Sequence, residues 1–356
     1  MSYYYQAARG QMDLWRQSRP IAEILDQETA DSELARRLHL VQDILHYAHT
    51  ELALPNNGNY RHYADLQRPY VVWNLFAAPE LSLEPKQWCY PLLGCLSYRG
   101  YFNAEDALAK AHSLQQQGWD TYVGGVLAYS TLGWFKDPVL NTFWQLDDVG
   151  LAALIFHELA HLIAFVADDT TFNESFATAV ELYGTGQWLA RQAPTIPDSG
   201  PQHFQRLQAR FEQRQQTFKI VSESAEQLRR LYASDLSDSL KQQGKQRLFQ
   251  ELQARYQQLR QSWGEDLGFD AWFQTPFNNA KLITLTSYYD AVPMFLEKIH
   301  QLDGNLPAFY DWVRQLAEQP KAERDAILAQ LAPPPLPAAG PVPVHRTGQD
   351  TEELQD

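Results

Sequence analysis

The stretch HELAH at residues 157–161, followed by NESFA at residues 173–177, predicts a helix whose histidines can share a metal ion. Residues four apart lie on one face of an α-helix, one turn above each other. The rings of His157 and His161 can therefore point at one Zn²⁺ ion, with Zn–N bonds of about 2.0–2.1 Å. Glu158 follows the first histidine, so its carboxylate can reach a water on the metal without binding the metal. This pattern predicts a metallohydrolase with Glu158 as general base.

The residues around the motif predict a core helix. Residues 151–156 (LAALIF) and 162–166 (LIAFV) are apolar, so the helix would be apolar nearly all round. Two histidines and a glutamate on a buried helix are unfavourable unless something satisfies them, and a metal would do so. The alternative is a pair of core histidines hydrogen-bonded to neighbours, with Glu158 at a solvated edge.

The third metal ligand must come from outside HELAH. In the longer pattern H-E-x-x-H-x-x-G-x-x-H, a glycine and a histidine would stand where this chain has Ala164 and Ala167. Residues 168–171 indicate a break between helices, and residues 172–190 have helical character. Glu174 would then lie in the first turn of the second helix, facing the first. Two histidines and a glutamate form an established catalytic zinc set with one position open for water.

Alternatives to Glu174 stay open at this point. Asp168 or Asp169 could bind the metal, and Glu174 could close a capping box with Thr171. Glu181 lies seven residues after Glu174, nearly on the same helix face. We expect it to accept the N–H of a ligand imidazole, with a solvated surface glutamate as the alternative.

A resemblance to known peptidases extends these motifs. Residues 173–181 (NESFATAVE) are similar to the N-E-x-F-A…V-E segment of gluzincin aminopeptidases. More closely, the chain resembles a bacterial family of predicted zinc aminopeptidases over most of residues 2–330. That likeness is carried by GCLSYRGYF (94–102), AYSTLGWF (128–135), HELAH…NESFAT, NNA (278–280), and Tyr288 with Val292-Pro293. It implies a mainly helical α+β, gluzincin-like zinc peptidase with a small sheet, one Zn²⁺ ion and a peptide substrate.

The resemblance also implies where the substrate binds. In such peptidases an edge strand before the metal helix pairs with the extended substrate backbone. We expect this strand at residues 121–129, with Gly125, Ala128 and Tyr129 in contact with substrate; an ordinary buried strand is the alternative. The well-known aminopeptidases carry a glutamate here that holds the free amine, and residues 121–135 contain none. An endopeptidase or a cell-wall peptide amidase therefore stays open as an alternative function.

Further roles are assigned by their place in the region of resemblance. Tyr288, with Tyr289 as rival, is the candidate that stabilises the oxyanion. Asn278 and Asn279 could bind a substrate terminus or cap the following helix. Arg99 is a candidate for orienting a carboxylate near the site.

Composition and net charge indicate a globular protein and disfavour some classes of binding partner. The chain has 356 residues, of which 45% are hydrophobic, and ten tryptophans, as expected of a globular protein. Its net charge of −14 disfavours nucleic acid and anionic membrane surfaces as partners. No apolar run reaches membrane-spanning length.

The two cysteines and the N-terminus bear on the compartment. Cys89 and Cys95 bracket a short loop with proline and glycine and could close as a disulfide, which would place the protein outside the cytosol. The chain begins MSYYYQ with no signal peptide. Members of the resembled family often begin with a lipoprotein signal, so we expect the periplasmic side of a bacterial membrane, with a lipid anchor on the full-length precursor.

The expected organisation is one peptidase domain over residues 1–331. N-terminal helices span 4–53, and the catalytic core spans about 60–195 and 265–331. The core includes strands near 71–76 and 92–98 and a helix at 104–117. The Gln- and Arg-rich residues 200–263 predict a helical hairpin, broken near 233–235, that walls one side of a cleft. A partner-binding arm on a non-catalytic zinc protein is the alternative. The Pro-rich, then acidic, residues 332–356 are expected to be disordered.

Overall fold

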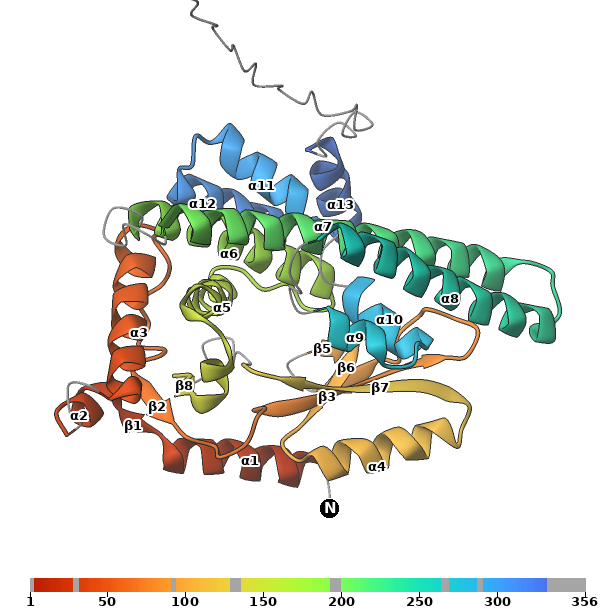
Figure 1. The fold of residues 1–356 in the computed structure, drawn as a ribbon, viewed down its shortest axis with the longest axis horizontal. Coiled ribbons are helices and arrows are strands. Elements are labelled where there is room, and N and C mark those ends of the chain that lie inside the picture. Colours follow the sequence, from red (N-terminus) through yellow and green to blue (C-terminus); the bar gives the residue numbers. More distant parts are fainter. Residues whose placement is uncertain are drawn as a thin grey trace, which may run out of the picture.

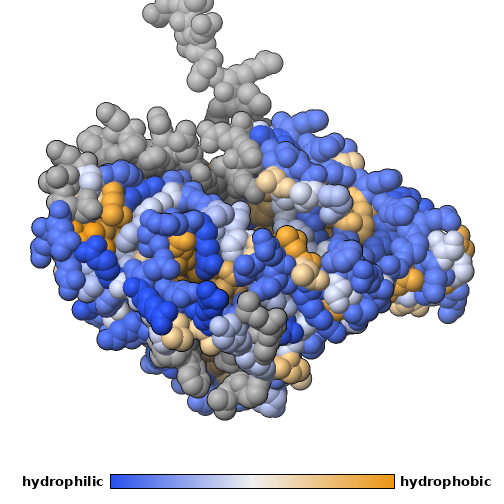
Figure 2. All heavy atoms as spheres, turned by 90° about the horizontal axis from the view of Figure 1, so that it is seen from below, coloured by the Kyte–Doolittle hydropathy of each residue, from blue (hydrophilic) through white to orange (hydrophobic). Residues whose placement is uncertain are grey.

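A computed structural model describes residues 3–27, 32–90, 94–128, 136–192, 200–263, 269–286 and 291–331 (Figure 1). Helices account for 63% of the residues that the structure describes, and the strands form small sheets. The predicted mainly helical α+β class is therefore confirmed. The described chain contains no helix long and apolar enough to cross a bilayer. In Figure 2 the face seen from below is mostly hydrophilic, with small apolar patches.

The N-terminal segment forms helices α1 (Tyr3–Gln17), α2 (Ile21–Leu25) and α3 (Glu33–Thr50). Helix α3 begins at Ser32, whose hydroxyl accepts a hydrogen bond from the amide of Ala35. Its apolar residues recur at helical spacing and pack the helix against α5 (Asp148–Ala160). A short sheet of β1 (Arg19–Pro20), β2 (His62–Ala64) and β8 (Val139–Leu140) ties these helices to the body.

The larger sheet has three antiparallel strands in the order β6-β3-β7. The strands are β3 (Val72–Pro79), β6 (Tyr98–Tyr101) and β7 (Trp119–Val126), and helix α4 (Ala104–Gln115) covers one face. The strand expected at 92–98 is divided at Ser97 into two, with β5 (Gly94–Leu96) before it and the start of β6 after it, while residues 92 and 93 lie outside the described residues. A separate hairpin of β4 (Trp88–Tyr90) and β5 (Gly94–Leu96) occupies that region, and Cys89 is disulfide-bonded to Cys95 across it.

The centre of the molecule is the pair of helices α5 and α6 (Thr170–Gln192), preceded by the 3₁₀ helix η1 (Asn141–Gln145). Helix α11 (Val292–Gln301) packs on α6, and α12 (Leu306–Ala317) and α13 (Lys321–Gln330) pack on α11 (Figure 1). The ring of Phe176 contacts those of Phe295 and Phe309 across this junction. These helices and the N-terminal segment share one hydrophobic core, so the metal-motif helix is held from several sides.

The predicted helical hairpin is present as α7 (Gly200–Ala233) and α8 (Asp238–Ser262), joined at residues 234–237. It continues into α9 (Asp270–Gln274) and α10 (Asn279–Thr286). A second hydrophobic core joins the hairpin and α10 to Ala78 of β3. The ammonium of Lys245 on α8 lies 2.6 Å from a carboxylate oxygen of Asp120 on β7. The hairpin is therefore packed on the end of the sheet.

Candidate metal centre

Helix α5 carries the HELAH motif and ends inside it. The side chain of Asp147 caps the start of the helix by accepting the amide of Gly150 at 2.7 Å. The helix ends at Ala160, with His161 as its C-cap residue. The amides of the next two residues bond to carbonyls three positions back, which tightens the turn. The expected apolar helix through residue 166 is therefore wrong, and Phe165 is 41% exposed. The four-residue spacing of the two histidines is kept.

The segment that joins α5 to α6 is fixed by side chains that bond to its backbone. The carboxamide of Asn173 accepts the amide and donates to the carbonyl of Val166, both at 2.8 Å. Asp168 adopts φ +65° and accepts the amide of Cys95 at 2.8 Å, which ties this turn to β5. These contacts hold Asn173, and with it the neighbouring Glu174, in one orientation.

The cap of α6 settles two of the open alternatives. Asp169 accepts the amide of Phe172 at 3.1 Å and is the N-cap residue, so a capping box of Thr171 with Glu174 is wrong. The other oxygen of Asp169 lies 2.6 Å from the buried guanidinium of Arg324. Because Asp168 and Asp169 both have other partners, neither faces the histidines as a ligand.

The side chains of His157, His161 and Glu174 converge on one point. The two Nε2 atoms lie 3.2 Å apart. A carboxylate oxygen of Glu174 lies 3.3 Å from Nε2 of His157, and its other oxygen lies 3.8 Å from Nε2 of His161. Four ligands placed tetrahedrally at about 2.05 Å from a zinc ion are roughly 3.3 Å from one another. The spacing and chemistry of these donors therefore fit a zinc ion, and the described residues contain this group as a candidate metal site.

A second carboxylate orients the first histidine. Nδ1 of His157 lies 3.1 Å from Glu181, which is on α6 two turns after Glu174. The other oxygen of Glu181 accepts a hydrogen bond from the guanidinium of Arg214 on α7 at 3.1 Å. Glu181 is 13% exposed and is not a solvated surface residue. The sequence offered no signal for Arg214, because its helix is rich in arginine throughout.

The electrostatics of the cluster suit a cation. Burial lowers the pKa of His157, but the hydrogen-bonded carboxylates of Glu174 and Glu181 outweigh burial and raise it to about 10. Burial lowers the pKa of His161 to about 4. Burial would raise the pKa of Glu174, yet the neighbouring His161 and His157 bring it below its usual value. The carboxylates of Glu174 and Glu181 thus favour a positive charge at the point where the two imidazoles meet.

Glu158 differs from the other carboxylates of the cluster. It is 8% exposed, and burial raises its pKa to about 7. Nearby negative charges, from Glu174, Asp137 and Glu181, raise it further, while His157 opposes the shift. A carboxylate with a pKa near neutrality is matched to taking up and releasing a proton at physiological pH.

The positions predicted to contact substrate on and after β7 differ in their surroundings. The strand is an edge strand, as expected. Gly125 lies on the α4 side of the sheet, where an added Cβ would overlap the ring of Tyr70, and Ala128 is buried in the main core. The carbonyl of Thr121 is already bonded to Asn278. The prediction for Ala128 is therefore wrong, because the core uses its side chain, whereas Gly125 is exposed and its contact with substrate stays a prediction.

The asparagine pair has a structural role. Asn278 caps α10 by accepting the amide of Lys281, which is the alternative that the sequence left open. Asn279 is fully buried, and its amide donates to the carbonyls of Pro79, Glu80 and Ser82. Both side chains are used to fasten α10 to the sheet, so the prediction that they bind a substrate terminus is wrong.

Three predicted site residues lie outside the described residues, namely Tyr129, Tyr288 and Tyr289. The role suggested for Arg99 is wrong. Its guanidinium lies over the ring of Tyr3, 3.7 Å from the centroid, and near Trp88, on the sheet face away from the metal cluster. An arginine in an aromatic cluster of this kind serves packing.

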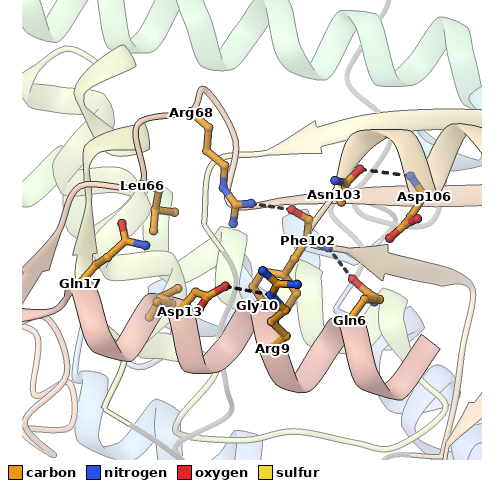
Figure 3. A pocket seen from close by; sticks show the side chains of 11 residues that line it. Gln6, Arg9, Gly10, Asp13, Gln17, Leu66, Arg68, Phe102, Asn103 and Asp106 are labelled. Atoms are coloured by element: carbon orange, nitrogen blue, oxygen red, sulfur yellow. Dashed lines mark hydrogen bonds and ion pairs between the residues drawn. The ribbon is translucent and has the colours of Figure 1, made fainter. Parts of the chain in front are cut away.

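A cavity of about 340 Å³ lies between α1 and the start of α4 (Figure 3). Gln6 accepts the backbone amide of Phe102 at 3.0 Å, and Arg68 donates to its carbonyl at 2.5 Å. The cavity contains none of the three converging ligands. We therefore place the functional site at the histidine cluster and not at this cavity.

A protein-family model described as "Putative aminopeptidase" matches residues 2–328. The match covers most of the sequence, so the chain belongs to this family and is a hydrolase of the peptidase class. No curated protein and no solved structure matched the chain.

Proposed function

We propose that this protein is a zinc-dependent metallopeptidase that acts as an aminopeptidase on small peptides. The observation that supports this most is the convergence of His157, His161 and Glu174 at ligand distances from one another, with Glu158 beside them. Membership of the aminopeptidase family supports a peptide as substrate.

The residues of the site have distinct tasks in this proposal. Zinc, when bound, supplies a Lewis acid that activates water and polarises a carbonyl. Glu158 accepts the proton of the attacking water and passes it to the leaving amine, and such general acid–base help typically gives about 10²–10⁴-fold in rate. Glu181 holds the ring of His157 in place by accepting its Nδ1–H.

The test is hydrolysis of an unblocked aminoacyl-arylamide by the purified protein. Activity should require zinc, disappear with a chelator and return when zinc is restored. The Glu158→Gln variant should lose at least about 100-fold in kcat while binding one zinc ion per chain. Full activity of Glu158→Gln would refute the assigned base.

An endopeptidase or cell-wall peptide amidase is the second candidate. A specific contact favours it, because the one acidic residue of β7, Asp120, is bonded to Lys245 and to the amide of Asn279. It is therefore not free to hold a substrate amine. Comparing free-amine with N-acetylated peptides separates the two functions, since an aminopeptidase cleaves only the former.

We further propose that the protein works on the periplasmic side of a bacterial membrane. The Cys89–Cys95 disulfide supports an oxidising compartment. Cell fractionation of the native host, with thiol labelling before and after reduction, tests this location.

A further inference from the structure

The segment between α5 and α6 sets how far apart the candidate metal ligands lie, because the two histidines precede it and Glu174 follows it. Within this segment Asp168 has φ +65°, in the left-handed region that is uncommon for residues other than glycine. Such a conformation persists where surrounding contacts hold it. For Asp168 that contact is the hydrogen bond that its carboxylate accepts from the amide of Cys95 on β5, at 2.8 Å.

The approach of β5 to Asp168 is close. Gly94, which precedes Cys95, also has a positive φ of +73°, and a Cβ added to it would lie 2.9 Å from a carboxylate oxygen of Asp168. Glycine therefore permits both the backbone conformation and the short distance at this position. The end of β5 and the turn after α5 are thus fitted to each other over two consecutive residues of the strand.

Strand β5 is in turn linked to the body of the protein through β4. Its three residues are all half-exposed, and it pairs with β4. Strand β4 is well anchored, because Trp88 is buried in the core between the larger sheet and α4 and Tyr90 packs against the same core. Cys89 of β4 and Cys95 of β5 stand directly opposite each other and form the disulfide. The disulfide therefore joins the anchored strand to the strand that contacts Asp168.

A reductant can reach this disulfide, because Cys89 is an exposed residue. The chain contains no other cysteine, so thiol chemistry reports on this bond alone. A thiolate of a dithiol attacks the sulfur of Cys89 and breaks the bond, and Cys95 leaves as a thiolate that takes up a proton. The second thiol of the reductant then displaces Cys89. The products are two cysteine thiols and one oxidised dithiol.

We propose that the Cys89–Cys95 disulfide is a redox-sensitive clamp on the metal centre. This inference rests on the zinc site of the proposed function. When the bond is closed, it holds Cys95 against Asp168, and the segment between α5 and α6 keeps Glu174 beside the two histidines. When it is reduced, β5 loses its covalent link to β4, and Asp168 is less firmly held in its left-handed conformation. Zinc is therefore bound more tightly by the oxidised protein than by the reduced one.

The double variant Cys89→Ser with Cys95→Ser tests the proposal. We expect its Kd for zinc to be about five- to tenfold higher than that of the oxidised wild type, the size of effect that losing one hydrogen bond gives. Competition with a chromogenic chelator measures the Kd. Wild type that has been reduced with dithiothreitol, separated from it and alkylated should show the same weakening. Alkylation prevents the freed thiols from binding zinc themselves.

A second variant, Asp168→Ala, tests whether the disulfide acts through the proposed contact. It should raise the Kd for zinc by a similar factor, and adding it to the double cysteine variant should change the Kd little further, because both changes remove one contact. Asp303→Ala is the matched control, since Asp303 also has a positive φ, +52°, and lies exposed between α11 and α12. Fully additive effects of the cysteine and Asp168 changes would overturn the inference.

Two further measurements separate the clamp from a purely structural role and from the proposed function. Urea unfolding of the metal-free proteins reports stability alone. If the cysteine variant is less stable but binds zinc as tightly as the wild type, the inference is overturned, and the proposed function stands if the wild type cleaves peptides. If the wild type binds zinc more tightly than the variant but cleaves no peptide, the inference stands and the proposed function fails.

Discussion

The imidazole of His157 has a hydrogen-bond partner on each of its nitrogens, which sets it apart from His161. Its Nδ1 faces Glu181 at 3.1 Å, whereas the buried Nδ1 of His161 has no partner within the described chain. A carboxylate behind a ligand imidazole fixes both its tautomer and its direction. In this site the ring of His157 is therefore held in place by a hydrogen bond from behind, and the ring of His161 is not.

We predict that Glu181→Ala weakens zinc binding about 10–100-fold, because the ring of His157 loses the acceptor that orients it. Zinc affinity is measured by competition with a chromogenic chelator. Glu251→Ala, which removes an exposed glutamate on α8, is the control. Unchanged zinc affinity in Glu181→Ala would show that His157 is oriented without it.

At the scale of elements, the start of α6 is where several segments meet. Asp169 caps the helix and pairs with Arg324 on α13, and both side chains are about 5% exposed. This pair links the C-terminal helices to the turn that positions Glu174. Removing one partner leaves the other buried without its counter-charge.

We predict that Asp169→Asn lowers the free energy of unfolding by about 3–5 kcal/mol, as is typical when one partner of a buried ion pair is lost. Urea unfolding measures this, with Asp311→Asn as control, because Asp311 is in an exposed pair with Arg314. A loss equal to that of the control would mean that the pair adds nothing to stability.

The same pair gives a pH dependence of known sign. Burial would raise the pKa of Asp169, but Arg324 and the amide of Phe172 bring it below its usual value of 3.8 in the folded protein. Its stabilisation is therefore fully present above about pH 4 and is lost as pH falls through the lowered folded-state pKa. The stability difference between wild type and Asp169→Asn should be constant from pH 7 to pH 5 and shrink below about pH 4. A difference that grew on acidification would contradict this assignment.

At the scale of the whole molecule, the metal centre connects parts that are distant in sequence. The ligands come from α5 and α6, the carboxylate behind His157 is held by Arg214 of the hairpin, and α5 packs on the N-terminal α3. An ion bound at this junction is bound only by the folded chain, so its binding free energy adds to the stability of the whole domain.

We predict that zinc at a free concentration of about 1,000 times its Kd stabilises the protein by about 4 kcal/mol. Thermal unfolding with zinc and with chelator measures the shift. His157→Ala should abolish the zinc-dependent shift. It should lower the stability of the metal-free protein by less than the stabilisation that zinc gives the wild type. An equal shift in wild type and His157→Ala would place the ion elsewhere.

Much of the site could be predicted from sequence because it depends on local geometry. The four-residue spacing of the histidines, the helix that carries Glu174 and the seven-residue step to Glu181 all follow from the helical repeat. The helical hairpin and its break near residue 234 follow from periodicity as well. Each of these features is fixed within one or two turns of chain.

Tertiary packing decided the rest. The turn after α5 is bonded locally by Asn173 to Val166, but Asp168 in the same turn accepts the amide of Cys95, which is distant in sequence and is brought close only by the fold. Ala128, Asn278 and Asn279 were predicted to contact the substrate, but the core buries the first and neighbours from other elements bond the other two. Conversely, the part that Arg214 plays arises from a long-range contact with Glu181, which no spacing along the chain encodes. The sequence by itself determined which side chains could share a metal ion, and only the tertiary structure decided which surfaces remain open to a substrate, because burial depends on elements far apart in the chain.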